Sequence, residues 1–211
     1  MSSYVVVGGN GNMGMRYRAI LTSLGHHVYV DDVGMKKYAI PYEKINGVVI
    51  ATPTNTHFEI IKKYHNINSS WPILCEKPIS KNMDEIIDLC NMPGLKLTMV
   101  NQYCWGSKLV PVLVKNKMSV WDFIHSGKDG LHWDCINIIG MHEDKTIPVV
   151  LRRASPRWTC VINGKILTLD DVDRGYYDMI AGWLNSDHNH SDLSYIYKSH
   201  NRVIQYIRGQ K

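Results

Sequence analysis

The 211-residue sequence has no long hydrophobic run and no closely spaced pair of cysteines. Its longest apolar stretches, around residues 47–51 and 109–114, are as long as a strand and far below the ~18 residues that a membrane span needs. The five cysteines are scattered and form no C-x-x-C pair. This distribution argues against a disulfide framework and against a zinc site, and it is typical of thiols in a reducing compartment.

The sequence gives no indication of export, and its basic charge is not concentrated in one place. Residues 1–4 contain no basic stretch and no cleavage site, and they run directly into a valine-rich segment, so we expect a cytoplasmic protein. The net charge is +5, but lysines and arginines alternate with acidic residues along the whole chain. Because nucleic-acid binding needs basic residues gathered on one face, we expect neither a nucleic-acid partner nor a membrane partner.

Short β-branched segments alternate with helical patterns between residues 4 and 102. The apolar spacing predicts helices over residues 13–24, 58–64 and 83–90. Strands are predicted over residues 4–7, 27–30, 47–51, 72–75 and 95–100. Such alternation favours an α/β fold, a Rossmann-like doubly wound parallel sheet.

The pattern changes after residue 102, where we expect a small α+β C-terminal domain. A short helix is predicted over residues 108–116, a turn-rich connection over 121–130, and strands over 149–153 and 158–163. Asn163-Gly164 is a typical two-residue hairpin turn, and two helices over 171–184 and 193–207 close the chain. We therefore predict two domains, residues 1–117 and 118–211, the second serving substrate binding or dimerisation.

The first strand is followed by a glycine-rich turn. Gly9, Gly11 and Gly14 fit the pattern G-x-G-x-x-G between a strand and a helix. In a dinucleotide-binding turn the first glycine makes the bend, the second admits the pyrophosphate, and the third allows helix and strand to pack closely. The helix N-terminus then offers N–H groups to the phosphates. The predicted cofactor-binding turn comprises Gly9, Asn10, Gly11, Asn12, Met13 and Gly14.

An acidic residue at the end of the second strand completes this pattern. Asp31 is expected to bind the adenosine ribose hydroxyls and to repel a 2′-phosphate, which favours NAD over NADP. Asp32 is the alternative for this role. Lys36 and Lys37 lie close enough in sequence to bind a phosphate, which leaves NADP open as a second cofactor.

Two further motifs follow the third and fourth predicted strands. The first reads Ala-Thr-Pro-Thr-Asn-Thr-His over residues 51–57, and the second reads Glu-Lys-Pro over residues 76–78. Both lie at carboxyl ends of parallel strands, where doubly wound sheets bind their ligands. Over about residues 4–110 the chain resembles the Gfo/Idh/MocA oxidoreductases, which carry a glycine-rich turn, an A-T-P-x-x-x-H segment and an E-K-P motif in this order. It resembles a short member of that family with a reduced C-terminal domain.

This resemblance implies NAD(P)-dependent hydride transfer at a secondary alcohol or carbonyl of a sugar, cyclitol or related small molecule. Lys77 matches the family's catalytic lysine, which binds the reacting hydroxyl and takes part in proton transfer. Thr52 and Pro53 would line the cofactor, together with Glu76 and Lys77. Glu76 and Pro78 would set the direction of the lysine, the Lys77–Pro78 bond being a candidate cis peptide. His57 is interpreted as structural.

The family's second catalytic segment, D-x-G-x-H, is altered in this chain. Its best match is Lys128-Asp129-Gly130-Leu131-His132, with a lysine in the position of the aspartate. In this register His132 takes the place of the family's acid/base histidine, and Asp129 is the nearest carboxylate that could orient it. Tyr103 follows the last predicted strand of the first domain and is expected to contact the substrate.

These observations leave two functions open. The first is an enzyme, an NAD(P)-dependent dehydrogenase or reductase that acts on CH–OH groups of a small-molecule substrate. The second is a sensor or subunit that binds a dinucleotide without catalysis. The altered segment and the short second half favour the second function, and the intact Glu-Lys-Pro motif favours the first. We also expect a homodimer, because a reduced second domain would leave part of a sheet to be covered.

Overall fold

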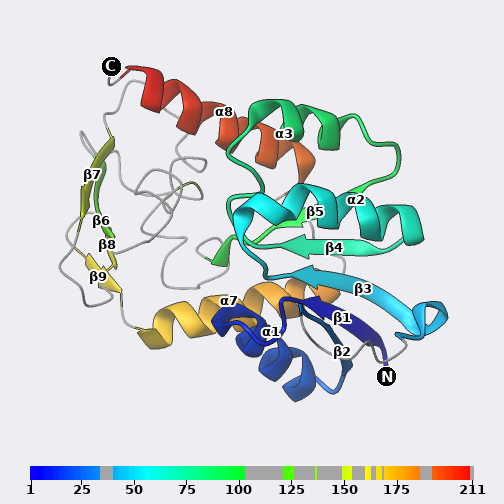
Figure 1. Ribbon diagram of the computed structural model, residues 1–211. Coiled ribbons are helices and arrows are strands. Elements are labelled where there is room, and N and C mark those ends of the chain that lie inside the picture. The colour runs from blue at the N-terminus through cyan, green and yellow to red at the C-terminus, as the bar shows by residue number, and fades with distance from the viewer. Residues whose placement is uncertain are drawn as a thin grey trace. The chain divides into compact units, whose positions relative to one another are not determined.

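The computed structural model describes residues 1–33, 40–102, 121–125, 136, 149–153, 160–162, 165–167, 169–185 and 192–209 (Figure 1). The chain forms two compact units. The first unit combines Met1–Val100 with Ile180–Ile196, and the second combines Asn101–Met179 with Tyr197–Lys211.

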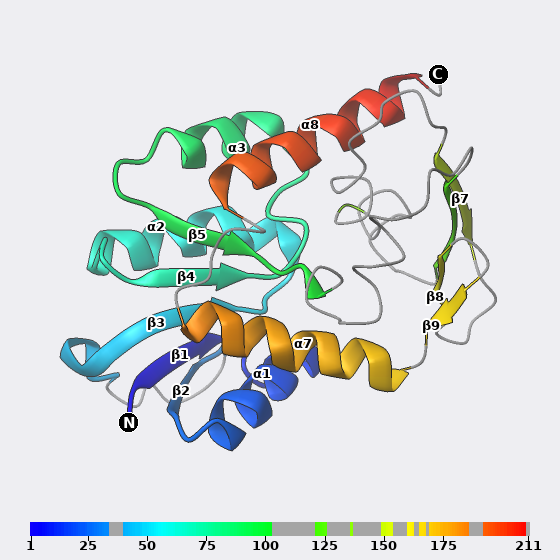
Figure 2. The ribbon, with the colours of Figure 1, turned by 180° about the vertical axis from the view of Figure 1, so that it is seen from behind.

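A five-stranded parallel sheet forms the centre of the first unit. Its strands lie in the order β2-β1-β3-β4-β5, and Figures 1 and 2 show β2 and β5 at the two edges. The bounds are β1 Ser3–Val7, β2 His27–Asp31, β3 Ile45–Ile50, β4 Pro72–Cys75 and β5 Lys96–Met99. Val7 is in register with Asp31 on one side and with Ile50 on the other. The first three strands therefore end at the same level.

Three helices connect these strands. They are α1 (Asn12–Ser23), α2 (His57–Ile67) and α3 (Met83–Cys90), with short 3₁₀ turns η1 (Tyr42–Lys44) and η2 (Thr54–Thr56). Because crossovers between parallel strands are right-handed, this strand order places α1 on one face of the sheet and α2 and α3 on the other. The sheet is thus doubly wound, as the sequence predicts.

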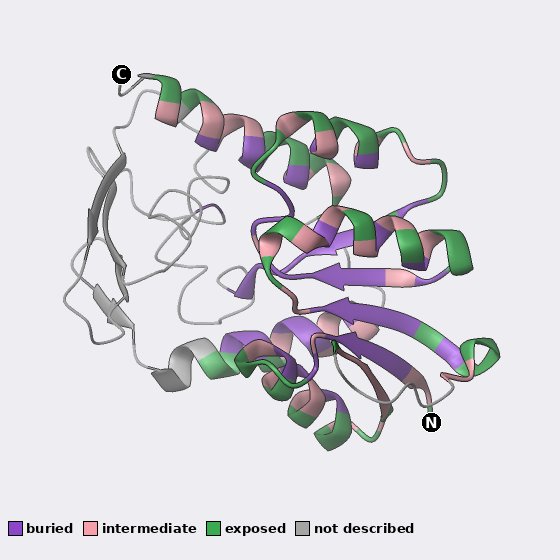
Figure 3. Cartoon of the chain, in the orientation of Figure 1, coloured by how far each residue is buried: buried purple, intermediate pink, exposed green. Residues whose placement is uncertain are grey.

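The core of the first unit lies between this sheet and its helices, where the strands are mostly buried (Figure 3). Each helix contributes a pair of buried side chains at helical spacing. These pairs are Tyr17 and Leu21, Ile61 and Tyr64, and Ile86 and Leu89. Trp183 joins this core from α7 (Leu169–Leu184), and its ring centroid lies 5.7 Å from that of Tyr4.

A second, mixed sheet belongs to the second unit. Its strands are β6 (Trp121–His125), β7 (Val149–Arg153), β8 (Cys160–Ile162) and β9 (Lys165–Leu167), in the order β7-β6-β8-β9. β6 pairs parallel with β7 and antiparallel with β8, and β8 pairs antiparallel with β9. The last helix, α8, spans Leu193–Gly209. A Cβ on Gly175 of α7 would lie 2.6 Å from the carbonyl oxygen of Gln102, so glycine permits this close approach.

The predicted elements agree with the described ones in most places. The five strands and three helices of the first unit are confirmed, as are the antiparallel strands on either side of residues 163–164 and the two C-terminal helices. One prediction is wrong: residues 121–125 form the strand β6 and are not part of a turn-rich connection. The helix predicted over 108–116 lies outside the described residues. None of the described helices has both the length and the apolar character of a membrane span.

Candidate functional site

The glycine turn after β1 is held against the ends of two neighbouring strands. Gly8 donates its N–H to the carbonyl oxygen of Asp31 at 2.8 Å and has a φ of +73°. A Cβ on Gly8 would lie 2.9 Å from the carbonyl oxygen of Ala51. Gly8 is not among the site residues that the sequence motif predicts. The sequence signal for this role is the pair of consecutive glycines directly after the strand, because glycine adopts a left-handed conformation without steric strain.

The three glycines of the motif differ in the space around them. A Cβ on Gly14 would lie 2.1 Å from the carbonyl oxygen of Gly8, and a Cβ on Gly9 would lie 2.7 Å from Cγ1 of Val30. These two positions therefore need glycine for packing within the protein. A Cβ on Gly11 would meet nothing closer than the Gly8 carbonyl oxygen at 3.4 Å, which is ordinary contact. Packing within the described residues does not require glycine at Gly11.

The N-terminus of α1 opens next to this turn. Gly11 is the N-cap residue, and no side chain among the described residues caps the helix there. Asn10, Gly11 and Asn12 are exposed. The first N–H groups of a helix have no partner within the helix and carry a positive partial charge. The turn therefore fits the pyrophosphate of a dinucleotide, whose anionic oxygens such N–H groups bind.

The two aspartates after β2 have different partners. Asp32 Oδ2 accepts the backbone N–H of Asn10 at 2.8 Å, so this carboxylate reaches the glycine turn. Asp31 Oδ2 accepts the hydroxyl of Tyr64 at 2.6 Å and pairs with Lys63 Nζ at 2.9 Å. Burial, together with the hydrogen bond to Asp31, raises the pKa of Tyr64, so its hydroxyl remains a donor. Asp31 is directed to α2, and Asp32 to the turn.

The segment after β3 is tied to the segment after β4 by one buried histidine. His57 is 1% exposed. Its Nε2 lies 2.8 Å from the carbonyl oxygen of Thr52, and its Nδ1 lies 2.9 Å from that of Pro78. Thr52 and Pro53 lie at the surface end of this arrangement, with Thr52 half-buried and Pro53 exposed. The sequence interpretation of His57 as structural agrees with these contacts.

The Glu-Lys-Pro motif continues directly from β4. Glu76 is buried; its Oε1 accepts the phenol of Tyr17 and its Oε2 accepts the backbone N–H of Lys77 at 3.1 Å. The Lys77–Pro78 peptide bond is cis, as predicted. Burial, and then the charge of Glu76, raise the pKa of the neighbouring Cys75 thiol well above its ordinary range. Cys75 is thus a neutral packing residue and no nucleophile.

Three sequence motifs therefore meet at the carboxyl ends of β1 to β4. The glycine turn contacts Ala51 and Thr52, Thr52 contacts His57, and His57 contacts Pro78. Sequence reasoning missed two supporting residues on α1. Tyr17 holds Glu76, and Arg18 donates to the carbonyl oxygen of Gly9 at 3.2 Å. Neither residue type signals such a role in a helix. The predicted residues Tyr103, Asp129 and His132, and also Lys36 and Lys37, lie outside the described residues.

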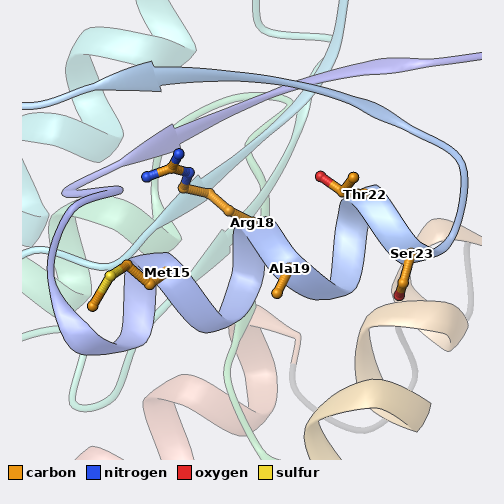
Figure 4. Close-up of a pocket in the computed structure, with 5 residues that line it drawn as sticks. All are labelled: Met15, Arg18, Ala19, Thr22 and Ser23. Carbon is orange, nitrogen blue, oxygen red and sulfur yellow. The ribbon is translucent and has the colours of Figure 1, made fainter.

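A pocket is lined by side chains of α1, among them Arg18, which also contacts the glycine turn. It has a volume of about 560 Å³. The described residues around it are Met15, Arg18, Ala19, Thr22 and Ser23, all on α1 (Figure 4). None of them belongs to the glycine turn or to the segments around Thr52 and Lys77. Within the described part of the chain, no group of three or more His, Cys, Asp or Glu side chains could hold a metal ion.

Comparison with protein families identifies the family that the first unit of the chain resembles. Residues 6–98 match the model of the family GFO_IDH_MocA, described as an oxidoreductase family with an NAD-binding Rossmann fold. Residues 6–98 are a Gfo/Idh/MocA domain. Its cofactor is NAD, and the exposed start of α1 and the closely packed glycines around it fit this dinucleotide. No protein of curated function matches the sequence.

Solved structures with a Gfo/Idh/MocA-like fold resemble the whole chain. The WlbA (WbpB) dehydrogenase from Thermus thermophilus, in complex with NAD and UDP-GlcNAcA, is 12% identical with a TM-score of 0.70, over 98% of this chain and 94% of that one. A myo-inositol dehydrogenase from Corynebacterium glutamicum is 12% identical with a TM-score of 0.69, over 99% and 96%. The UDP-N-acetylglucosamine 3-dehydrogenase GnnA from Acidithiobacillus ferrooxidans is 13% identical with a TM-score of 0.69, over 96% and 95%. At these identities the likeness shows a shared fold.

Proposed function

We propose that this chain is an NAD-dependent dehydrogenase or reductase for a secondary alcohol or carbonyl of a sugar, cyclitol or related small molecule. The observation that carries this proposal is the setting of Lys77. Every residue from Ile73 to Ser80 is buried except Lys77, which is half-buried. Lys77 is therefore the one partly exposed residue of an otherwise buried segment. It lies at the carboxyl ends of the strands, where the glycine turn also lies.

The proposed role of Lys77 follows from what the reaction requires. A dinucleotide held at the glycine turn would supply the hydride chemistry, as the hydride acceptor in its oxidised form and as the hydride donor in its reduced form. The carbinol must also lose its hydroxyl proton, and the carbonyl oxygen must gain one. The Lys77 amine, as a donor and acceptor of protons at this edge, would bind that oxygen and take or give the proton. The glycine turn would hold the dinucleotide, and Glu76 and Pro78 would hold Lys77, at the carboxyl ends of the same strands.

The class of substrate is proposed from the similar structures. Their names describe a dehydrogenase bound to a nucleotide sugar acid, a myo-inositol dehydrogenase and a nucleotide-sugar 3-dehydrogenase. Each of these substrates carries secondary hydroxyls on a ring. We therefore propose a polyhydroxylated ring as the substrate of this chain.

Turnover assays with a matched pair of lysine variants test the proposal. Sugars, cyclitols and nucleotide sugars are screened with NAD, and NADH formation is followed by absorbance. Lys77→Met should lower the rate by about 10²–10⁴-fold, the usual contribution of a positioned proton-transfer group, while NADH affinity is kept. Lys96→Met is the control, because Lys96 is exposed at the start of β5, and it should turn over as the parent chain does.

The same assays contain the results that contradict the proposal. If a substrate is turned over and Lys77→Met retains the full rate, Lys77 is not the proton-transfer group. If NADH binds and no polyhydroxylated substrate in the panel is turned over, the chain is a dinucleotide-binding sensor or subunit, and the enzymatic proposal is wrong.

A further inference from the structure

The two residues that flank Lys77 in sequence are held by different helices. Glu76, on its N-terminal side, is bound by a side chain of α1. Pro78, on its C-terminal side, is bound through its carbonyl oxygen by a side chain of α2. Because α1 and α2 lie on opposite faces of the sheet, the backbone at Lys77 is held from two directions.

The contact from α1 is a chain of two hydrogen bonds. The phenol of Tyr17, which is completely buried, donates to Glu76 Oε1. The second carboxylate oxygen, Oε2, accepts the backbone N–H of Lys77 at 3.1 Å. A buried carboxylate needs donors to replace the water that it loses. Tyr17 and the Lys77 amide supply two such donors, so the position of Glu76 and that of the Lys77 amide are linked.

The contact from α2 depends on the imidazole of His57. Its two ring nitrogens face two carbonyl oxygens, that of Thr52 at 2.8 Å and that of Pro78 at 2.9 Å. A neutral imidazole has one N–H and donates to one carbonyl, whereas the doubly protonated ring donates to both. The bond that reaches the Lys77 segment is the one from Nδ1 to Pro78.

We propose that Tyr17 and His57 are positioning residues that fix the backbone of Lys77 through Glu76 and Pro78. A lysine side chain has a long flexible stem, so the protein can aim its amine only if the backbone below it is fixed. A displacement of about 1 Å at a reacting group can lower a rate by about 100-fold. For its consequence in catalysis this inference rests on the function proposed for Lys77. The positioning itself is measurable without a substrate.

Amide hydrogen exchange at Lys77, resolved by NMR in the full chain, tests the contact from α1. Tyr17→Phe removes the hydroxyl and keeps the ring, and the Lys77 amide should then exchange about tenfold faster. Tyr64→Phe is the matched control, because Tyr64 is equally buried and its hydroxyl binds Asp31 instead. In that variant the Lys77 amide should exchange as it does in the parent chain. Rapid exchange at Lys77 in the parent chain, or no acceleration in Tyr17→Phe, would overturn this half of the proposal.

A pair of histidine variants tests the contact from α2. The amide of an asparagine reaches the place of Nδ1, and that of a glutamine reaches the place of Nε2. His57→Asn should therefore keep the bond to Pro78 and the exchange rate at Lys77, whereas His57→Gln should keep only the bond to Thr52 and raise that rate. In the parent chain, ¹⁵N-correlated spectra of the ring should show a proton on Nδ1. An Nδ1 without a proton, or equal exchange rates in the two variants, would overturn this half.

Two further readouts separate this inference from the proposed function. For any substrate that is turned over, Tyr17→Phe and His57→Gln should lower kcat per folded molecule and leave the KM for NAD unchanged. The folded fraction of each variant is measured by circular dichroism, because partial unfolding would also lower the apparent kcat. NADH titration of the same samples tests the cofactor independently. If the parent chain fails to bind NADH, the proposed function fails, and the exchange rates still decide whether Tyr17 and His57 position Lys77.

Discussion

The carboxylate of Asp32 accepts the backbone N–H of Asn10 at 2.8 Å, which joins the end of β2 to the glycine turn. The neighbouring Asp31 is directed away, to Tyr64 and Lys63 of α2. Asp31 is the last residue of β2 and Asp32 is the first residue after it, so the two carboxylates leave the strand end toward different neighbours. The two acidic residues that the sequence offered for ribose binding therefore have separate surroundings.

This division predicts different effects for two isosteric variants. Asp32→Asn should weaken NADH binding by about tenfold, because it removes a charged acceptor that holds the turn at Asn10. Asp31→Asn should instead lower the free energy of unfolding by about 1 kcal/mol, because the buried hydroxyl of Tyr64 loses a charged acceptor. NADH titration and urea unfolding of both variants distinguish the effects. Loss of NADH binding in Asp31→Asn with unchanged stability would make Asp31 the ribose ligand, as first expected from the sequence.

In the glycine turn, we expect one alanine variant to lose NADH affinity and another to lose stability. Gly11→Ala should fold normally, because its Cβ meets no described atom closer than 3.4 Å. If the pyrophosphate approaches the backbone here, this methyl group should weaken NADH binding by at least about tenfold, or ~1.4 kcal/mol. Gly14→Ala places a Cβ 2.1 Å from the Gly8 carbonyl oxygen and should cost roughly 1–3 kcal/mol of stability. Unchanged NADH affinity in Gly11→Ala would move the pyrophosphate away from this turn.

The buried thiol of Cys75 predicts a pH dependence of stability. Burial raises its pKa in the folded chain, whereas in the unfolded chain it ionises near its ordinary pKa of about 8.5. The unfolded state therefore binds fewer protons above that pH, and stability should fall as the pH rises, by up to ~1.4 kcal/mol per pH unit for this group. Cys75→Ala should show a smaller slope in urea unfolding between about pH 8.5 and 10. Equal slopes in both chains would show that Cys75 ionises without unfolding.

The predictability of the first unit has a physical reason. Its strands and helices follow from local patterns, since β-branched runs and apolar residues at helical spacing need no knowledge of distant partners. β6 was missed because residues 121–125 are strand only through pairing with β7 and β8, which are distant in sequence. The order of the strands likewise depends on long-range pairing. The sequence therefore predicted a doubly wound parallel sheet but not the order of its strands.

The candidate site divides in the same way. Glycine, aspartate and Glu-Lys-Pro residues were found because their spacing after strands has a chemical meaning. Tyr17 was not found, because a tyrosine on the apolar face of a helix is indistinguishable from packing until Glu76 is seen beside its hydroxyl. Gly8 was passed over because the motif is satisfied one residue later. Contacts between distant residues carry the information that local sequence lacks.

The most direct test of the account is titration of the purified chain with NADH and NADPH, followed by energy transfer from its six tryptophans. We expect saturable binding of NADH, weaker binding of NADPH, and a loss of NADH affinity in Gly11→Ala with unchanged folding. Absence of binding by either dinucleotide to the folded chain would contradict the assignment of the glycine turn, and with it the oxidoreductase function built on Lys77.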